Sequence, residues 1–130
     1  MIYLFNRVDP YYTLVDRLFR DAQAGARSIV LSVISEAEML VKPLREGDVF
    51  QADLIDALFQ GPEHVEVWPV DRKVAHRAAY LRARLGLRLD DAFIVATAVE
   101  AGCDALVGND ALCARRVADI PYVYLDEALS

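Results

Sequence analysis

The stretch GLRLDDAFIVATAVEAGCDALVGND, residues 86–110, decides the fold of this 130-residue chain. It predicts a helix that begins at Asp90 or Asp91 and is apolar on every face. A helix of that composition has to be buried in the interior of a domain. A short strand follows at residues 105–108, and Asp110 begins a further short helix. The stretch therefore predicts a buried helix that feeds a strand.

Outside this stretch the sequence alternates strands and helices. Residues 28–34 (SIVLSVI) are β-branched and apolar, which is typical of a strand buried on both faces. Residues 65–70 (VEVWPV) predict a strand near an edge, because Pro69 cannot donate to a ladder. Other expected elements are helices over 14–22, from Ser35 to a kink or end at Pro43, over 48–59 and from Asp71 to Gly86, and a last strand over 120–125. This order predicts an α/β fold of three layers, with a mainly parallel sheet flanked by helices.

Length and composition place narrow bounds on the protein. One domain over residues 1–130 is expected, and 55% hydrophobic residues exclude disorder as the main state. The apolar run at 92–99 is far short of the ~20 residues that span a bilayer. The start has no secretory signal, and two cysteines form neither a disulfide framework nor a zinc pattern, so we expect a cytoplasmic protein without membrane partners. The net charge of −6 argues against binding nucleic acid by bulk charge alone.

Three carboxylates follow strands or begin helices: Glu38, Asp91 and Asp110. The carboxyl ends of parallel strands lie at one edge of a sheet, where open α/β sheets bind ligands. We therefore expect Glu38 and Asp110 to converge there, with Asp91 if its helix begins at that edge. Gathered carboxylates repel one another, and a hard cation such as Mg²⁺ or Mn²⁺ relieves that repulsion. The pattern points towards metal-dependent phosphodiester chemistry.

Each of these acids also has a structural explanation. Ser35 and Glu38 fit a capping box, which we weigh about equally with a role in a site. Asp90, Asp91 and Asp110 are natural N-caps, and for any one of them alone capping is the better interpretation. Only their joint placement favours a site.

Basic residues cluster over residues 72–88. They are either a rim that faces the phosphates of a substrate or the solvated side of an amphipathic helix, and the second interpretation is favoured for most of them. Arg88, close to Asp91, is the best candidate for a contact with the substrate, with Arg84 as a further candidate.

The sequence resembles PIN-domain proteins of the VapC-like toxin ribonuclease type, over essentially the whole chain. The resemblance rests on LSVISEAEMLVKPLREGD (31–48), on residues 86–110 and on YVYLDE (122–127). The family's metal-binding acids correspond to Glu38, Asp91 and Asp110, and its Asn-Asp pair brings in Asn109 as an RNA-contact candidate. Gly108 stands where a Thr or Ser is usual, which removes one hydroxyl from the site.

The start of the chain departs from the family, in which a first strand ends in Asp-Thr-Asn. MIYLFN can be aligned with that strand, which puts Phe5 at the Asp position, or MIYLFNRVDPYY can be aligned with the helix that follows it. We favour the second alignment, in which the first strand and its Asp lie before Met1. The chain is then a PIN-like domain without its first strand, with an impaired metal site and with neighbouring strands left unpaired unless another segment fills the gap.

The resemblance implies an endoribonuclease that uses Mg²⁺ or Mn²⁺ and a metal-activated water to hydrolyse RNA, although the missing Asp leaves it open whether this chain is an active enzyme. It also implies a homodimer and a VapB-like antitoxin as partners. The main alternative is a non-catalytic PIN-like binding module for RNA or protein. A receiver-like phosphoacceptor domain is disfavoured, because Asp126 and Glu127 follow the last strand where a Lys is expected.

Overall fold

A single parallel sheet organises the described part of the chain. The computed structural model describes residues 2–4, 20, 24–25, 28–61, 64–108 and 111–124. Within these residues the strands are β1 (Ile2–Leu4), β2 (Ile29–Ser32), β3 (Val65–Trp68), β4 (Ala105–Gly108) and β5 (Tyr122–Tyr124). They are all parallel and lie in the order β3-β2-β1-β4-β5. The predicted parallel sheet is confirmed, and Val65–Trp68 is an edge strand as expected.

β1 occupies the centre of this sheet. Ile2 pairs with Ile29 of β2 on one side and with Ala105 of β4 on the other. The prediction that the first strand lies before Met1 is therefore wrong, and so is the expectation of unpaired neighbours. The prediction failed because it relied on the helical spacing of the residues further along the chain and disregarded the short apolar run IYL. These three residues are enough to form a strand between β2 and β4.

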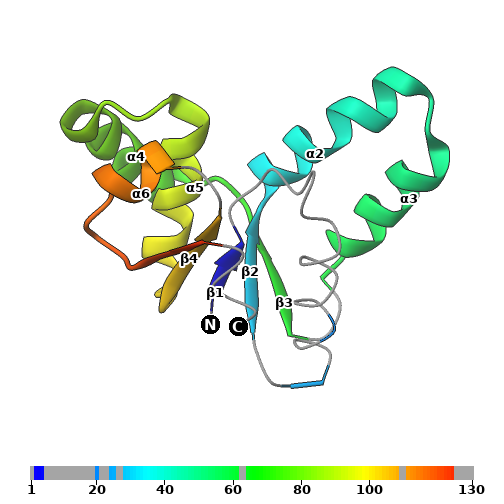
Figure 1. Ribbon diagram of the computed structural model, residues 1–130, viewed down its shortest axis with the longest axis horizontal. Coiled ribbons are helices and arrows are strands. Elements are labelled where there is room, and N and C mark those ends of the chain that lie inside the picture. The colour runs from blue at the N-terminus through cyan, green and yellow to red at the C-terminus, as the bar shows by residue number, and fades with distance from the viewer. Residues whose placement is uncertain are drawn as a thin grey trace.

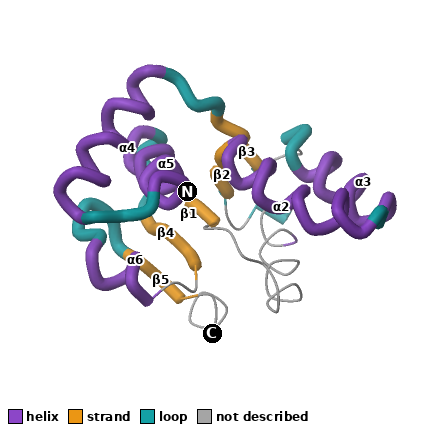
Figure 2. Tube along the Cα trace, turned by 90° about the horizontal axis from the view of Figure 1, so that it is seen from above, coloured by secondary structure: helices purple, strands orange, loops and turns teal. Residues whose placement is uncertain are grey.

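Helices flank the sheet in two groups. α4 (Arg72–Leu85), α5 (Leu89–Glu100) and α6 (Ala111–Arg116) lie on one side of the molecule, and α2 (Val33–Glu46) and α3 (Val49–Leu58) form a hairpin on the other. The view from above shows β1 and β2 between these two groups (Figure 2). No helix of the described part is long and apolar enough to cross a membrane.

The core is built around α5, as its all-apolar sequence predicts. Its Ala92, Ile94 and Val95 are fully buried, and the helix packs on α4, β2 and β4. α4 turns Val74, Ala78 and Leu81 towards it, the face expected from their spacing. Packing against α4, β2 and β4 thus holds α5 on the sheet and fixes the position of its first turn.

The expected end of the helix at Pro43 needs correction. Pro43 lies inside α2, because the helix continues to Glu46 and ends at Gly47 with a φ of 68°. That left-handed conformation suits glycine and closes the helix with a bond from the Gly47 N–H to the Leu44 carbonyl. The helix expected over residues 14–22 falls almost entirely outside the described residues.

Candidate functional site

Glu38 lies in the second turn of α2, directly beyond the end of β2. The helix begins one residue after Ser32, whose Oγ accepts a hydrogen bond of 3.1 Å from the Ile34 N–H. The expected capping box of Ser35 and Glu38 is therefore wrong, since both residues lie inside the helix and Ser32 is the N-cap. Glu38 is half-buried at this position. A capping box therefore does not explain the presence of this acid.

Asp91 lies in the first turn of α5. That helix begins at Leu89 and its N-cap is Arg88, so neither Asp90 nor Asp91 is the N-cap that the sequence predicts. Asp90 still binds the backbone of the first turn, because its Oδ1 accepts a bond of 3.0 Å from the Asp91 N–H. Asp90 thus stabilises the helix end, as an acid near the positive pole does, and its neighbour Asp91 is half-buried.

The fold brings the helices of these two acids together at one edge of the sheet. α2 starts from the carboxyl end of β2. α5 is joined to the start of β4 by only residues 101–104 and runs back beside that strand, so its first turn lies towards the same edge (Figure 1). The two helices contact one another. The helices that carry Glu38 and Asp91 therefore meet at one edge of the sheet, and a metal site shared by the two acids stays a prediction.

Asp110 and Asn109 lie outside the described residues. They follow β4 in the sequence, and Ala111 begins α6 directly after them. The expected role of Asp110 in the site therefore stays a prediction. Among the residues that are described, no group of three or more His, Cys, Asp or Glu is arranged to hold a metal ion.

The donors that are described fit a hard divalent cation by their chemistry. Glu38 and Asp91 offer carboxylate oxygens, the ligands that Mg²⁺ and Mn²⁺ prefer. Soft donors do not fit the same region: Cys113 is buried in the core, and burial raises the pKa of the Cys103 thiol to about 11. One or two carboxylates and retained waters are enough to hold Mg²⁺, so this pair fits such a cation, and Asp110 is the further donor that the family resemblance implies.

The far end of α5 carries a different carboxylate, which sequence analysis did not single out. Glu100 is hydrogen-bonded to Arg77 Nε and lies 3.5 Å from Lys73 Nζ, and its side chain is only 9% exposed. The Arg77 guanidinium, helped by Lys73, holds the pKa of Glu100 below its usual range, against the opposing effect of burial. These partners make Glu100 a packing residue that ties α4 to α5.

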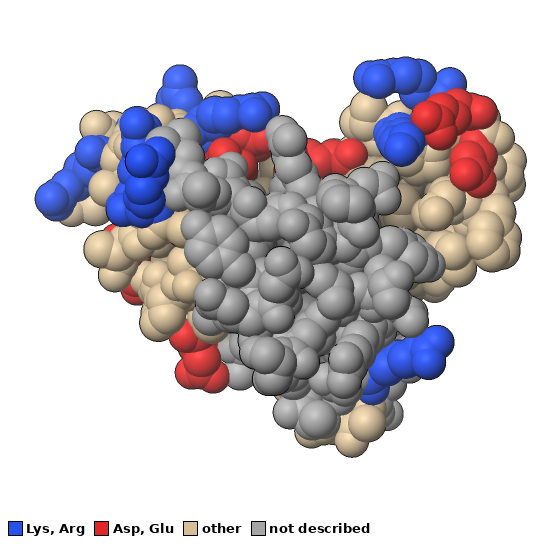
Figure 3. Space-filling view, in the orientation of Figure 1, with Lys and Arg blue, Asp and Glu red and all other residues tan. Residues whose placement is uncertain are grey.

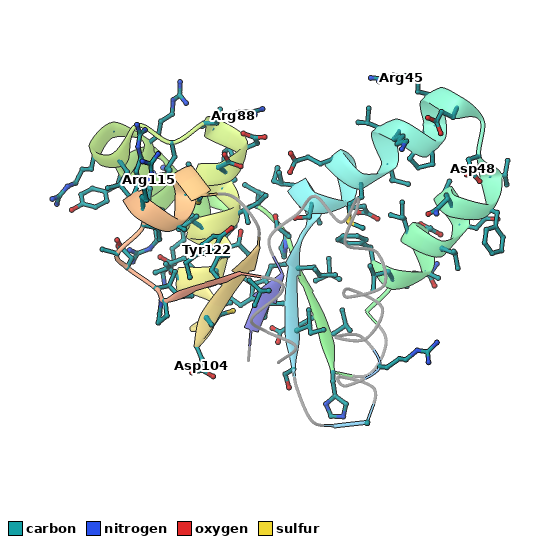
Figure 4. All side chains as sticks on the ribbon, viewed as in Figure 1. Arg45, Asp48, Arg88, Asp104, Arg115 and Tyr122 are labelled. Atoms are coloured by element: carbon teal, nitrogen blue, oxygen red, sulfur yellow. The ribbon has the colours of Figure 1, made fainter. Side chains whose placement is uncertain are left out.

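The RNA-contact candidates lie on the exposed surface of the α4–α5 side. Arg88 is exposed and pairs with Asp90 at 3.4 Å. The guanidinium of Arg84 lies 5.3 Å from the centre of the Tyr80 ring. Arg115 and Arg116, which the sequence analysis did not include, are brought to this surface by α6, and Figure 4 shows Arg88 and Arg115 on the same lobe. Only tertiary structure could have revealed that addition.

Comparison with known proteins gives a fold and a family. The chain resembles VapBC2 from Rickettsia felis, solved bound to a DNA fragment from its promoter, with a TM-score of 0.70, 18% identity and coverage of 95% of this chain and 98% of that one. The comparison with VapBC-1 from nontypeable Haemophilus influenzae has a TM-score of 0.68 at 16% identity and covers 97% of this chain and 99% of that one. The comparison with FitAcB from Neisseria gonorrhoeae has a TM-score of 0.60 at 18% identity and covers 96% of this chain and 98% of that one.

No curated protein sequence matches this chain significantly. The PIN domain family does match, over residues 1–119, from the central strand through the turn that precedes β5. The matched region contains β1, both described carboxylates and the segment after β4. The chain belongs to the PIN domain family.

Proposed function

We propose that this chain is a metal-dependent endoribonuclease of the VapC-like toxin type. The observation that carries the proposal is the contact between α2 and α5 at the carboxyl edge of the sheet, because each helix presents a half-buried carboxylate in its first two turns. Membership of the PIN family and the likeness to VapBC structures support the same function.

In this proposal Glu38, Asp91 and Asp110 hold Mg²⁺ or Mn²⁺. A bound divalent cation lowers the pKa of a water molecule and neutralises charge on a phosphoryl oxygen, the two requirements for hydrolysis of a phosphodiester. The half-buried setting of Glu38 and Asp91 limits competition from solvent and keeps their oxygens oriented. Arg88, together with Arg84 and Asn109, contacts the RNA.

The proposed partners are a VapB-like antitoxin and a second copy of the chain, in the cytoplasm. Several of the solved relatives are toxin–antitoxin complexes. The α2–α3 hairpin supports a protein partner, because Leu44, Val49 and Phe50 are 68–73% exposed. Apolar groups of that size on one surface mark interaction sites in soluble proteins.

The test is RNA cleavage with and without MnCl₂. Glu38→Gln and Asp91→Asn should each lower the cleavage rate at least about a hundredfold while leaving the fold intact, because each removes one ligand charge. Glu36→Gln, an isosteric change in the same helix, and Asp90→Asn are the matched controls and should keep most of the activity. Equal losses in variants and controls would contradict the proposed site.

A non-catalytic binding module remains the second candidate. It is favoured by the sequence directly after β1, where Phe5 and Asn6 supply no carboxylate. Thermal unfolding separates the two candidates, since a cation that binds only the folded chain raises its stability. A rise in Tm with MnCl₂ in the wild type but not in Asp91→Asn supports the metal site. No rise at millimolar Mn²⁺ supports the binding module.

Asn6→Asp tests whether the site lacks one charge. Asn6 follows Leu4, the end of the central strand, by two residues, and the substitution adds a carboxylate without changing side-chain volume. We expect about tenfold tighter Mn²⁺ binding and faster cleavage than in the wild type. Asn109→Asp is not an equivalent test, because it adds the carboxylate after β4 and not after β1. Unchanged metal affinity in Asn6→Asp would show that the metal site does not use position 6.

A further inference from the structure

An exposed group of five arginines gathers where three segments of the chain meet. We name it the arginine surface. It consists of Arg82 and Arg84 in the last turn of α4, Arg88 before α5, and Arg115 and Arg116 at the end of α6. The chain as a whole carries a net charge of −6, yet Figure 3 shows Lys and Arg side chains concentrated over this lobe. Basic side chains are therefore concentrated on one part of a chain whose net charge is negative.

Two of the arginines are held in place by the backbone. Arg82 Nη1 donates to the Leu87 carbonyl at 2.8 Å, and Arg116 Nη1 donates to the Leu85 and Gly86 carbonyls at 3.2 Å each. These bonds satisfy carbonyls at the end of α4, which is a structural role. Arg82 makes one of these bonds and Arg116 makes two, both from Nη1, so most of the five N–H donors of each guanidinium remain available on a side chain whose conformation is already restricted.

The other three arginines have no such structural role. Arg84 lies over the Tyr80 ring and donates to its hydroxyl, which leaves the guanidinium exposed. Arg88 has one carboxylate partner, Asp90, at 3.4 Å. Arg115 makes no hydrogen bond or ion pair within the described residues. Like charges held this close repel one another, and a polyanion relieves that repulsion.

We propose that the arginine surface binds the phosphates of a single-stranded RNA segment that leads away from the candidate metal site. This rests on the proposed nuclease function. Arg88 lies three residues before Asp91, so the surface begins at the site itself and extends over α4 and α6. All five cations are arginines, whose planar fork matches the geometry of phosphate oxygens. Tyr80, which is 51% exposed, adds an aromatic ring beside them.

An acidic protein segment is the competing partner, and the structure favours RNA over it. Tyr80, which is 51% exposed beside Arg84, offers an aromatic ring against which a base of a single strand can stack, and an acidic polypeptide has no group that needs it.

The experiment measures RNA binding by fluorescence anisotropy in EDTA, where no cleavage is needed. The probe is a labelled oligouridine of about 20 nucleotides, long enough to track the surface. Arg84→Glu/Arg115→Glu changes two arginines that make no backbone bond, so the fold should be retained. Arg45→Glu/Arg72→Glu has the same change in formal charge, at exposed sites in the last turn of α2 and the first turn of α4.

The first double variant should raise the Kd for the oligouridine at least about tenfold and reduce the slope of log K against log salt by about 1–2. The control pair should change the Kd less than about threefold. Equal weakening in both pairs, or none in the first, would overturn the proposal. Displacement of the RNA by polyglutamate as effective as that by unlabelled RNA would assign the surface to an acidic polypeptide and overturn it too.

Failure of this inference is distinct from failure of the nuclease function. Asp91→Asn should lose cleavage but keep the wild-type Kd for RNA measured in EDTA. A wild-type chain that binds the oligouridine through the arginine surface but never cleaves RNA with Mn²⁺ would refute the nuclease and leave the arginine surface standing. Normal cleavage with unchanged KM in Arg84→Glu/Arg115→Glu would do the reverse.

Discussion

The two sides of the sheet use their apolar residues in opposite ways. On the α4–α5 side, Ile94 and Val95 are completely enclosed by the sheet and by neighbouring helices. On the α2–α3 side, Val49 and Phe50 lie 70% and 73% exposed. Each side nevertheless contributes one carboxylate to the candidate site, Asp91 from the enclosed helix and Glu38 from the hairpin. One half of the site thus stands on a closed core, and the other on an element with apolar surface available to a partner.

The largest expected effect comes from truncating the enclosed side. Ile94→Ala should lower the free energy of unfolding by about 3–4 kcal/mol, since it removes buried methyl groups and leaves a cavity. Phe50→Ala, a larger truncation on the exposed hairpin, should cost less than about 0.5 kcal/mol. Urea unfolding of both variants measures this difference. A similar loss for Phe50→Ala would show that the hairpin is covered within the monomer.

A smaller effect is expected where α4 is tied to α5. Glu100→Gln removes the charge that Arg77 and Lys73 share, and should cost about 1–2 kcal/mol, between the values for exposed and buried ion pairs. Because the pKa of Glu100 is lowered in the folded chain, its contribution to stability is fully present above about pH 4.5 and is lost as pH falls below that value.

The stability difference between wild type and Glu100→Gln should therefore shrink on acidification below about pH 4.5. Thermal unfolding at a series of pH values measures it. Asp53→Asn, at an exposed position in α3, is the control for replacing one carboxylate by an amide. A stability difference between wild type and Glu100→Gln that stays constant down to pH 3 would mean that the charge of Glu100 is not its cause.

The smallest effect concerns the cap that holds the hairpin to the sheet. Ser32→Ala removes the bond to the Ile34 N–H and should cost about 1 kcal/mol, whereas Asp48→Ala, at the exposed cap of α3, should cost less. Because Ser32 also links β2 to the helix that carries Glu38, its loss should reduce cleavage more than Asp48→Ala does. Equal losses of cleavage in Ser32→Ala and Asp48→Ala would show that the cap at Ser32 does not position Glu38.

Sequence patterns predicted the elements with strong local signals. The all-apolar composition of α5 and the spacing of Val74, Ala78 and Leu81 determine burial without reference to other segments. The patterns failed where competing local signals had similar strength. Ser32 and Ser35 are both residues that favour an N-cap position, and only the end of β2 decides which of them is the cap.

Long-range contacts account for the rest. The three residues IYL alone do not predict that they lie between β2 and β4, because their position depends on pairing with strands distant in the sequence. The same holds for Arg116, which reaches α4 only through the position of α6. Parallel topology predicted that the helix carrying Glu38 begins at the carboxyl edge of the sheet, whereas the placement of the Asp91 helix depended on how α5 packs against the strands.

The central place of β1 has a consequence for how the chain folds. In the described sheet, only the pairing of its three residues joins the β3–β2 pair to the β4–β5 pair. Their partners in β4, residues 105–107, lie far away in the sequence. Pairings of such high sequence separation close slowly. We expect a chain released from denaturant to assemble its two halves first and to join them in a late step that the N-terminal residues control.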